Sequence, residues 1–274
     1  MQPRILGKLE CSAANAAQTK LRATKGAQLR LKTNVSRNCA RVVLNSDQRN
    51  KVIKLLAKEV TAFTDSKDYS DLALYLLDSG YDSMTCRVLA GMQSAYKVEV
   101  EPYFRQLLEE LGLLDLQYKE DYLILFLIED YSKQVVSGSI DPQTALKVFY
   151  ALWIKSEFDP KLSRFIEITD AIELIGSGYW LIPDLTIDNA DRHIIATSHL
   201  LLLDLHEQLP ENFYSRYFCP NCISLVESKR PGFFQRLSNP DSSVCLNCRR
   251  PDLQSCNSLK GQEAYLAAFG HNFD

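Results

Sequence analysis

The sequence predicts an all-α fold: an irregular bundle of about eight helices, followed by a small C-terminal module of different character. Three observations lead to this prediction. From Ser46 onward, apolar residues recur at the spacing of amphipathic helices, and short turns separate these stretches. Strand signals are nearly absent, and no repeat of solenoid length is visible. After Phe213 the pattern changes to aromatic and turn-rich residues with two pairs of cysteines.

Residues 1–45 precede the bundle and form a basic segment. They contain nine Lys/Arg and one acid, with many small residues and no sustained apolar periodicity. Three explanations are open: a disordered arm, an organellar transit peptide, or a start codon assigned too early. A secretory signal is disfavoured because no apolar core follows the basic start. We favour a disordered arm or a start-site artefact.

Residues 46–212 are expected to form an acidic helical domain, and caps and glycines delimit its first four helices. Ser46-Asp47 offers the first cap. The next helices are expected over 70–77 and 82–91. A fourth ends at Gly112 and has Pro102 in its first turn.

Four further helices are expected in the second half of this domain. An apolar stripe ends at Gly138, and Asp141-Pro142 then supplies an N-cap and a first helical residue. The following helix runs over 160–175. A long last helix covers 188–209, where Pro210 stops it.

The four cysteines of the C-terminal module have the spacing of one metal site. Cys219 and Cys222 form one Cys-x-x-Cys pair, Cys245 and Cys248 form the second, and 22 residues separate the pairs. Two such pairs supply four thiolates to one tetrahedral ion, and soft sulfur ligands in a closed site favour zinc. An iron–sulfur cluster uses similar ligands, and unrelated dithiols or disulfides are the other alternative. We expect structural zinc.

This module resembles a zinc ribbon and is expected over 213–260, followed by a C-terminal tail over 261–274. Both knuckles have Asn at their third position, Asn221 and Asn247, and Asn tolerates the left-handed backbone that such turns often need. A module this small buries too little apolar surface to be stable by itself, so the metal is expected to supply much of its folding energy. We expect its apolar core to be separate from that of the helical domain.

Charge is distributed unevenly along the chain. The overall net charge is −3, but residues 46–215 contain fifteen Lys/Arg and twenty-eight acids, a balance of −13. Such a segment repels nucleic acid and attracts basic proteins. The candidate protein-docking residues are three adjacent acidic pairs, Glu109, Glu110, Glu120, Asp121, Glu129 and Asp130.

Basic residues beside the knuckles are candidates for contact with nucleic acid. Lys229 and Arg230 lie between the two cysteine pairs, and Arg249 and Arg250 follow the second pair. Aromatic residues of the module could stack on bases. The alternative, which we favour, is that the aromatic residues form the module's own core and the charges solvate its rim.

No catalytic residue is assigned. His199 and His206 share a face of one expected helix, but their spacing does not place two imidazoles on one metal. The adjacent acids point in different directions on a helix, and phosphate-binding and nucleophile motifs are absent from the sequence. We expect a protein that is not an enzyme. With no apolar run long enough to span a bilayer and with free cysteines expected, we assign it to the cytoplasm.

Two motifs resemble those of a group of uncharacterised small helical bacterial proteins. The first is Gly80-Tyr81-Asp82-Ser83 with Arg87-Val88-Leu89-Ala90-Gly91-Met92, and the second is Gly138-Ser139-Ile140-Asp141-Pro142. The resemblance covers residues 66–175 and omits both the basic segment and the cysteine module. Some members of this group look like immunity or accessory proteins encoded beside toxins. The motifs also have a structural explanation as helix starts and stops.

The functional expectation is a non-enzymatic interaction protein, immunity-like or accessory-like, whose acidic helical core binds a basic partner. The alternative is a nucleic-acid-associated regulator that acts through the zinc ribbon and the basic arm. Salt-dependent binding of DNA or RNA would distinguish the second from the first.

Overall fold

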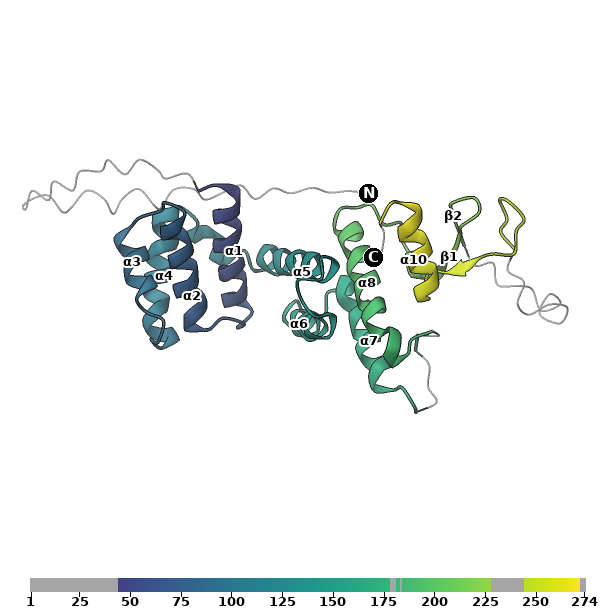
Figure 1. Cartoon of the computed structure of the whole chain (residues 1–274), viewed down its shortest axis with the longest axis horizontal. Helices are drawn as coiled ribbons and strands as arrows, with labels where there is room; N and C mark the ends of the chain where they lie inside the picture. Colours follow the sequence, from purple (N-terminus) through teal and green to yellow (C-terminus); the bar gives the residue numbers. More distant parts are fainter. Residues whose placement is uncertain (1–43, 178–180, 183, 228–243, 272–274) are drawn as a thin grey trace, which may run out of the picture. The chain divides into compact units, whose positions relative to one another are not determined.

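The structure is a computed structural model that describes residues 44–177, 181–182, 184–227 and 244–271 (Figure 1). Within these ranges the chain is mostly helical, with nine α-helices, several short 3-10 turns and one three-stranded sheet. The prediction of a helical bundle is therefore confirmed, while the term all-α leaves out the sheet. None of the described helices combines the length and the apolar character needed to cross a membrane.

The first four helices are α1 (Ser46–Val60), α2 (Ser66–Asp78), α3 (Met84–Ala90) and α4 (Lys97–Leu111). Asn45 caps α1 in a reciprocal arrangement: its side chain accepts from the Gln48 backbone N–H, and the Gln48 side chain accepts from the Asn45 N–H. The start of this helix is thus encoded locally.

Two helix starts differ from the prediction. Helix α2 begins after Asp65, which forms a capping box with Asp68, four residues before the expected Ser70. Ser70 is instead fully buried, and its hydroxyl donates to the Leu89 carbonyl oxygen at 3.0 Å. Helix α4 begins at Lys97, so Pro102 lies inside the helix rather than in its first turn.

The second half of the bundle contains α5 (Glu120–Val136), α6 (Pro142–Lys155), α7 (Ser163–Glu173) and α8 (Ala190–Leu205). Asp141 caps α6 through the Thr144 N–H, as expected. Helix α5 packs on α1 and α8, and α6 and α7 also pack on α8. One continuous apolar core runs from α1 to α8 and includes the stacked rings of Phe149 and Phe165.

The C-terminal module has strands β1 (Arg216–Cys219), β2 (Ser224–Glu227) and β3 (Gln254–Ser255), in the antiparallel order β2-β1-β3. A helix that the sequence did not predict, α10 (Leu259–Ala268), follows β3 and packs on α8 (Figure 1). The boundary expected at residue 260 lies inside this helix.

The module and the bundle share an apolar cluster. From α8 come Ala196 and Leu200, and the module contributes Phe213, Phe218, Cys256, Leu259, Tyr265 and Leu266. The expectation of a fully separate module core is therefore wrong. The side of α8 that carries Ala196 and Leu200 is covered by α10 and by the residues around β1. Only the immediate surroundings of the cysteines form a small cluster of their own.

Candidate metal centre

The four predicted ligands lie together. The ligand atoms of Cys219, Cys222, Cys245 and Cys248 are all within 4.8 Å of one another. The Sγ–Sγ distance is 3.5 Å between Cys219 and Cys248 and 3.6 Å between Cys222 and Cys245. A tetrahedral zinc ion with Zn–S bonds of about 2.3 Å places its sulfurs about 3.8 Å apart. The site therefore fits one four-coordinate ion of this size.

The sheet positions the first cysteine pair. Cys219 is the last residue of β1, and its register partner is Ser224, the first residue of β2, so Cys222 lies in the turn of this hairpin. The Ser224 hydroxyl is 3.0 Å from the Cys222 sulfur. The second pair is held by its own turn, in which the Cys245 backbone N–H donates to the Arg250 carbonyl and the Cys245 carbonyl accepts from the Arg249 N–H, each at 2.8 Å.

The left-handed residue of each knuckle is not the asparagine. Ile223 has φ 52° and Arg249 has φ 60°, and each directly follows the second cysteine of its pair. The expectation for Asn221 and Asn247 was therefore wrong by two positions. A β-branched residue with positive φ is rare because its Cβ crowds the backbone, so the first knuckle retains strain that glycine would remove.

The two asparagines instead connect the knuckles to each other. Asn221 donates to the Asp252 carboxylate at 2.8 Å and accepts from the Arg250 guanidinium at 3.0 Å. Asn247 donates to the Ser224 hydroxyl at 3.1 Å. Each knuckle thus reaches the residues that follow the other knuckle, and these contacts hold the four sulfurs together in addition to any metal.

Backbone N–H groups also favour the thiolate form of one ligand. The Cys248 N–H, and after it the Asn247 N–H, point toward the sulfur of Cys245 and lower the pKa of that thiol to about 6. Metal binding requires deprotonated thiols. The thiolate that a metal requires is therefore favoured at Cys245.

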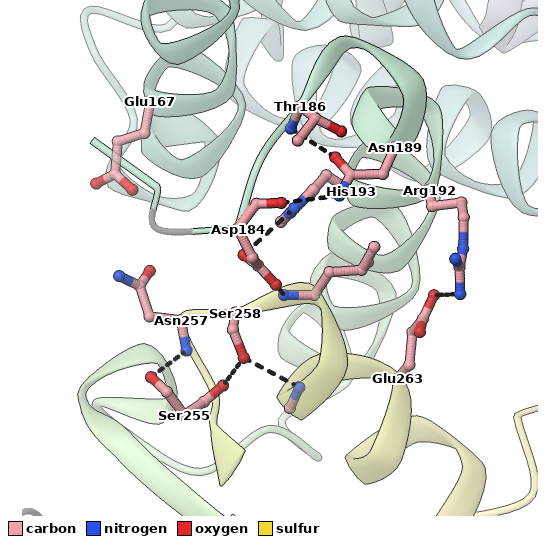
Figure 2. Close-up of polar contacts among 12 residues, drawn as sticks. Glu167, Asp184, Thr186, Asn189, Arg192, His193, Ser255, Asn257, Ser258 and Glu263 are labelled. Atoms are coloured by element: carbon pink, nitrogen blue, oxygen red, sulfur yellow. Dashed lines mark hydrogen bonds and ion pairs between the residues drawn. The ribbon is translucent and has the colours of Figure 1, made fainter. Parts of the chain in front are cut away.

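Polar contacts anchor the module to the helical bundle (Figure 2). The Asp184 carboxylate accepts from the Leu259 N–H at 2.7 Å, at the first residue of α10, where a negative charge is favourable. The buried Arg164 guanidinium donates to the Asn257 carbonyl at 2.8 Å. These two contacts link α7 and the segment that follows it to the loop after β3 and to the start of α10, and the sequence did not predict them.

His193 on α8 contacts Asp184, the residue that accepts from Leu259. Its side chain is fully buried, and its Nε2 is 3.5 Å from Asp184 Oδ1. Burial lowers the pKa of the imidazole, so the neutral form is favoured. The amide of Gln262 on α10 is also buried and has no hydrogen-bond partner among the described residues. Buried polar side chains are thus present on both α8 and α10.

The predicted nucleic-acid contacts are not brought together by the described residues. Lys229 and Arg230 lie outside the part of the chain that the structure describes. Arg249 is exposed, whereas Arg250 is engaged with Asn221 in the cross-link between the knuckles. The role shown for Arg250 is therefore structural.

The six acids predicted for docking lie in three separate pairs, at the end of α4, at the start of α5 and further along α5. Four of them contact other side chains of the protein: Glu110 with Thr85, Glu120 with Lys155, Glu129 with Lys133, and Asp130 with Lys54. Glu109 and Asp121 are exposed, and neither has an ion pair or side-chain hydrogen bond among the described residues.

The histidines considered for catalysis have different neighbours. The rings of His199 and His271 are 5.7 Å apart, whereas His206 lies 3.8 Å from Glu129. Burial, and secondarily His271, lowers the pKa of His199. Within the described ranges, the four cysteines are the only group of three or more metal-ligating side chains that lie close together.

Comparisons were made with protein-family models, with curated proteins and with solved structures. None of the three finds a match to this chain. The resemblance over residues 66–175 therefore stays an expectation, and the arguments below rest on the chain's own residues.

Proposed function

We propose that this chain is a non-catalytic interaction protein that binds a basic protein partner through its acidic helical core. In this proposal the four-cysteine site holds a structural zinc ion, which fixes the two knuckles and the sheet to which they belong. The metal takes no part in a reaction, because four protein thiolates leave no open coordination position.

The observation that carries this proposal is the imbalance of charges in residues 46–215. Of the fifteen Lys/Arg in this segment, eight form ion pairs with carboxylates, whereas only seven of its twenty-eight acids are used in ion pairs with Lys or Arg. Among the described residues this leaves 21 carboxylates against seven Lys/Arg. Pairs within the segment use one charge of each sign and leave its imbalance of 13 unchanged, and Arg192, which pairs with Glu263 outside the segment, raises it to 14.

A field of this kind acts mainly on the rate of association. Unpaired carboxylates steer a cationic partner toward the core, and screening by salt reduces the effect over a Debye length of about 8 Å at physiological ionic strength. Among the 21 carboxylates outside these ion pairs, Asp65, Asp141 and Asp184 cap or anchor helices. Glu109 and Asp121 have no such contact among the described residues, so their charge is available to a partner.

The test is stopped-flow association of the full chain with synthetic peptides rich in arginine or lysine, over a series of salt concentrations. The double variant Glu109→Lys/Asp121→Lys should associate more slowly with either peptide. The control Glu109→Asp/Asp121→Glu keeps the charge and should leave the rate unchanged. The proposal fails if basic peptides do not bind at low salt. Salt-sensitive binding of RNA or DNA that Arg249→Ala weakens would favour the nucleic-acid function instead.

A further inference from the structure

The solvent-facing side of α6 carries two large apolar residues beside Thr144, Lys147 and Lys155. Leu146, Phe149 and Leu152 form its buried stripe. On the other side, Tyr150 is 41% exposed and Ile154 is 51% exposed, one helical turn apart. A surface helix of a soluble protein normally places polar residues there. This face therefore carries apolar surface that the described residues leave uncovered.

Aromatic rings extend this face past the end of the helix. The ring of Trp153 is 6.2 Å from that of Tyr150 and 4.7 Å from that of Phe158, which it meets edge-on. Phe158 is 61% exposed. We call Tyr150, Trp153, Ile154 and Phe158 the aromatic corner.

The backbone around Phe158 is strained. Glu157 has φ 53° and Phe158 has φ 73°, two consecutive non-glycine residues in the left-handed region. The Phe158 N–H donates to the Trp153 carbonyl at 2.8 Å, which closes the turn. Strained backbone at an exposed ring favours a functional explanation, since burial does not compensate the strain.

Acidic residues lie beside the aromatic corner. Glu120 at the start of α5 forms an ion pair with Lys155 at 3.1 Å, so this end of α5 lies beside the corner. Asp121, next to Glu120, and Glu157 are both exposed, and neither has an ion pair among the described residues. With the exposed Lys147, one turn before Tyr150, the segments 118–122 and 147–159 together carry a net charge of −1. This balance favours a basic partner over a second copy of this acidic chain.

We propose that the aromatic corner is where the basic partner docks, through an arginine side chain that stacks on the exposed rings while Asp121 and Glu157 accept hydrogen bonds from its guanidinium. This inference rests on the proposed function and locates it on the surface. Arginine is favoured over lysine because its planar, weakly hydrated group stacks on aromatic faces and donates to carboxylates at the same time.

Trp153 provides a direct readout. The chain has two tryptophans, so in a Trp180→Phe variant of the full chain the fluorescence reports on Trp153 alone. An arginine-rich synthetic peptide should change this fluorescence and should bind more tightly than a lysine-rich peptide of equal charge. Loss of one stacking ring should weaken binding by about tenfold.

Three variants test the residues. Tyr150→Ala and Phe158→Ala should each weaken binding, and Phe158→Asn should do the same while keeping a residue that tolerates positive φ. The control Met84→Ala removes a side chain that is 75% exposed on α3 and should have no effect. If all four variants bind the peptide as tightly as the unsubstituted chain, the proposed role of the aromatic corner is overturned, and the acidic core remains the proposed binding surface. Failure of every basic peptide to bind would overturn both proposals.

Discussion

Gly261 is the position where one added methyl group should push α10 away from β3 within the C-terminal module. A Cβ at this residue would lie 1.9 Å from the Ser255 carbonyl oxygen, 2.5 Å from its carbon and 3.1 Å from the Cys256 nitrogen. All three are backbone atoms, so no side-chain rotation relieves the contact. In Gly261→Ala, α10 or β3 must move by about an ångström to reach the shortest distances that Cβ atoms tolerate.

The loss of stability in Gly261→Ala follows from the contacts at this position and from typical magnitudes. Alanine improves helix propensity by about 1 kcal/mol, and overpacking costs about 1–3 kcal/mol. The movement also endangers the Cys256–Arg216 backbone hydrogen bond and the contact between Leu259 and Asp184, each worth about 1 kcal/mol or more. We expect a net loss of about 2–3 kcal/mol, which lowers the melting temperature by about 5–10 °C for a chain of this length.

Thermal unfolding followed by circular dichroism measures the loss, and a chromogenic chelator measures whether metal is released sooner. The control is Gly91→Ala, because Gly91 also has negative φ, at −81°, but a Cβ there meets only the Val88 and Arg87 carbonyls at 3.5 and 3.9 Å. This variant should be neutral or slightly stabilised. Equal melting temperatures for the two variants would refute the close approach of α10 to β3.

The metal site, the strained knuckle, the first helix cap and the buried histidine each lead to a further prediction. The protein should bind one zinc per chain by elemental analysis, and Cys219→Ser should abolish stoichiometric binding; an iron chromophore would contradict the assignment. Ile223→Gly should raise the melting temperature, since relief of left-handed strain of about 1–2 kcal/mol exceeds glycine's entropic cost of about 0.5–1 kcal/mol. A chain that begins at Leu44 keeps every described contact and should melt with the full chain, whereas one that begins at Ser46 loses the α1 cap and about 1 kcal/mol. The His193 pKa is lowered in the folded protein, so stability should fall as pH decreases from 6.5, where the unfolded state takes up more protons; His193→Gln should lose this part of the pH dependence in urea titrations.

Local signals predicted much of the helical fold. Asp141-Pro142 and Ser83 are caps in the structure, and Gly112 and Gly138 follow their helices with positive φ. These features succeed because a cap or a left-handed glycine acts within one turn of the chain. The prediction of a helix start at Ser70 is wrong because a serine hydroxyl can cap a helix but can also bond elsewhere. In the structure it donates to Leu89 on another helix.

Helix α10 was not predicted from the sequence because Gly261, which lies within it, has two opposing effects. Gly261 is a helix breaker by propensity, yet here it is the residue that allows α10 to approach Ser255. The small residues of this helix also give it no marked amphipathic pattern. Only the contact of Gly261 with Ser255, which is absent from the local sequence, shows that the second effect applies here.

The ligands could be predicted but their supports could not. The cysteine pattern alone identified the four sulfurs, because two Cys-x-x-Cys pairs are the usual source of four ligands for a tetrahedral site. The anchor of Asp184 on Leu259 joins residues 75 positions apart, and Arg164 reaches Asn257 over 93 positions. Contacts between residues so distant in the chain leave no periodic trace in one sequence.

The position of α10 at the end of the described chain has a consequence for biosynthesis. A ribosome makes α8, Phe213 and Phe218 before it makes the helix that covers them. During that interval Leu200 and both phenylalanines face water, as in other partly synthesised chains that attract chaperones. A product terminated before residue 259 would keep this apolar surface permanently, so cellular proteases should remove it faster than the completed chain.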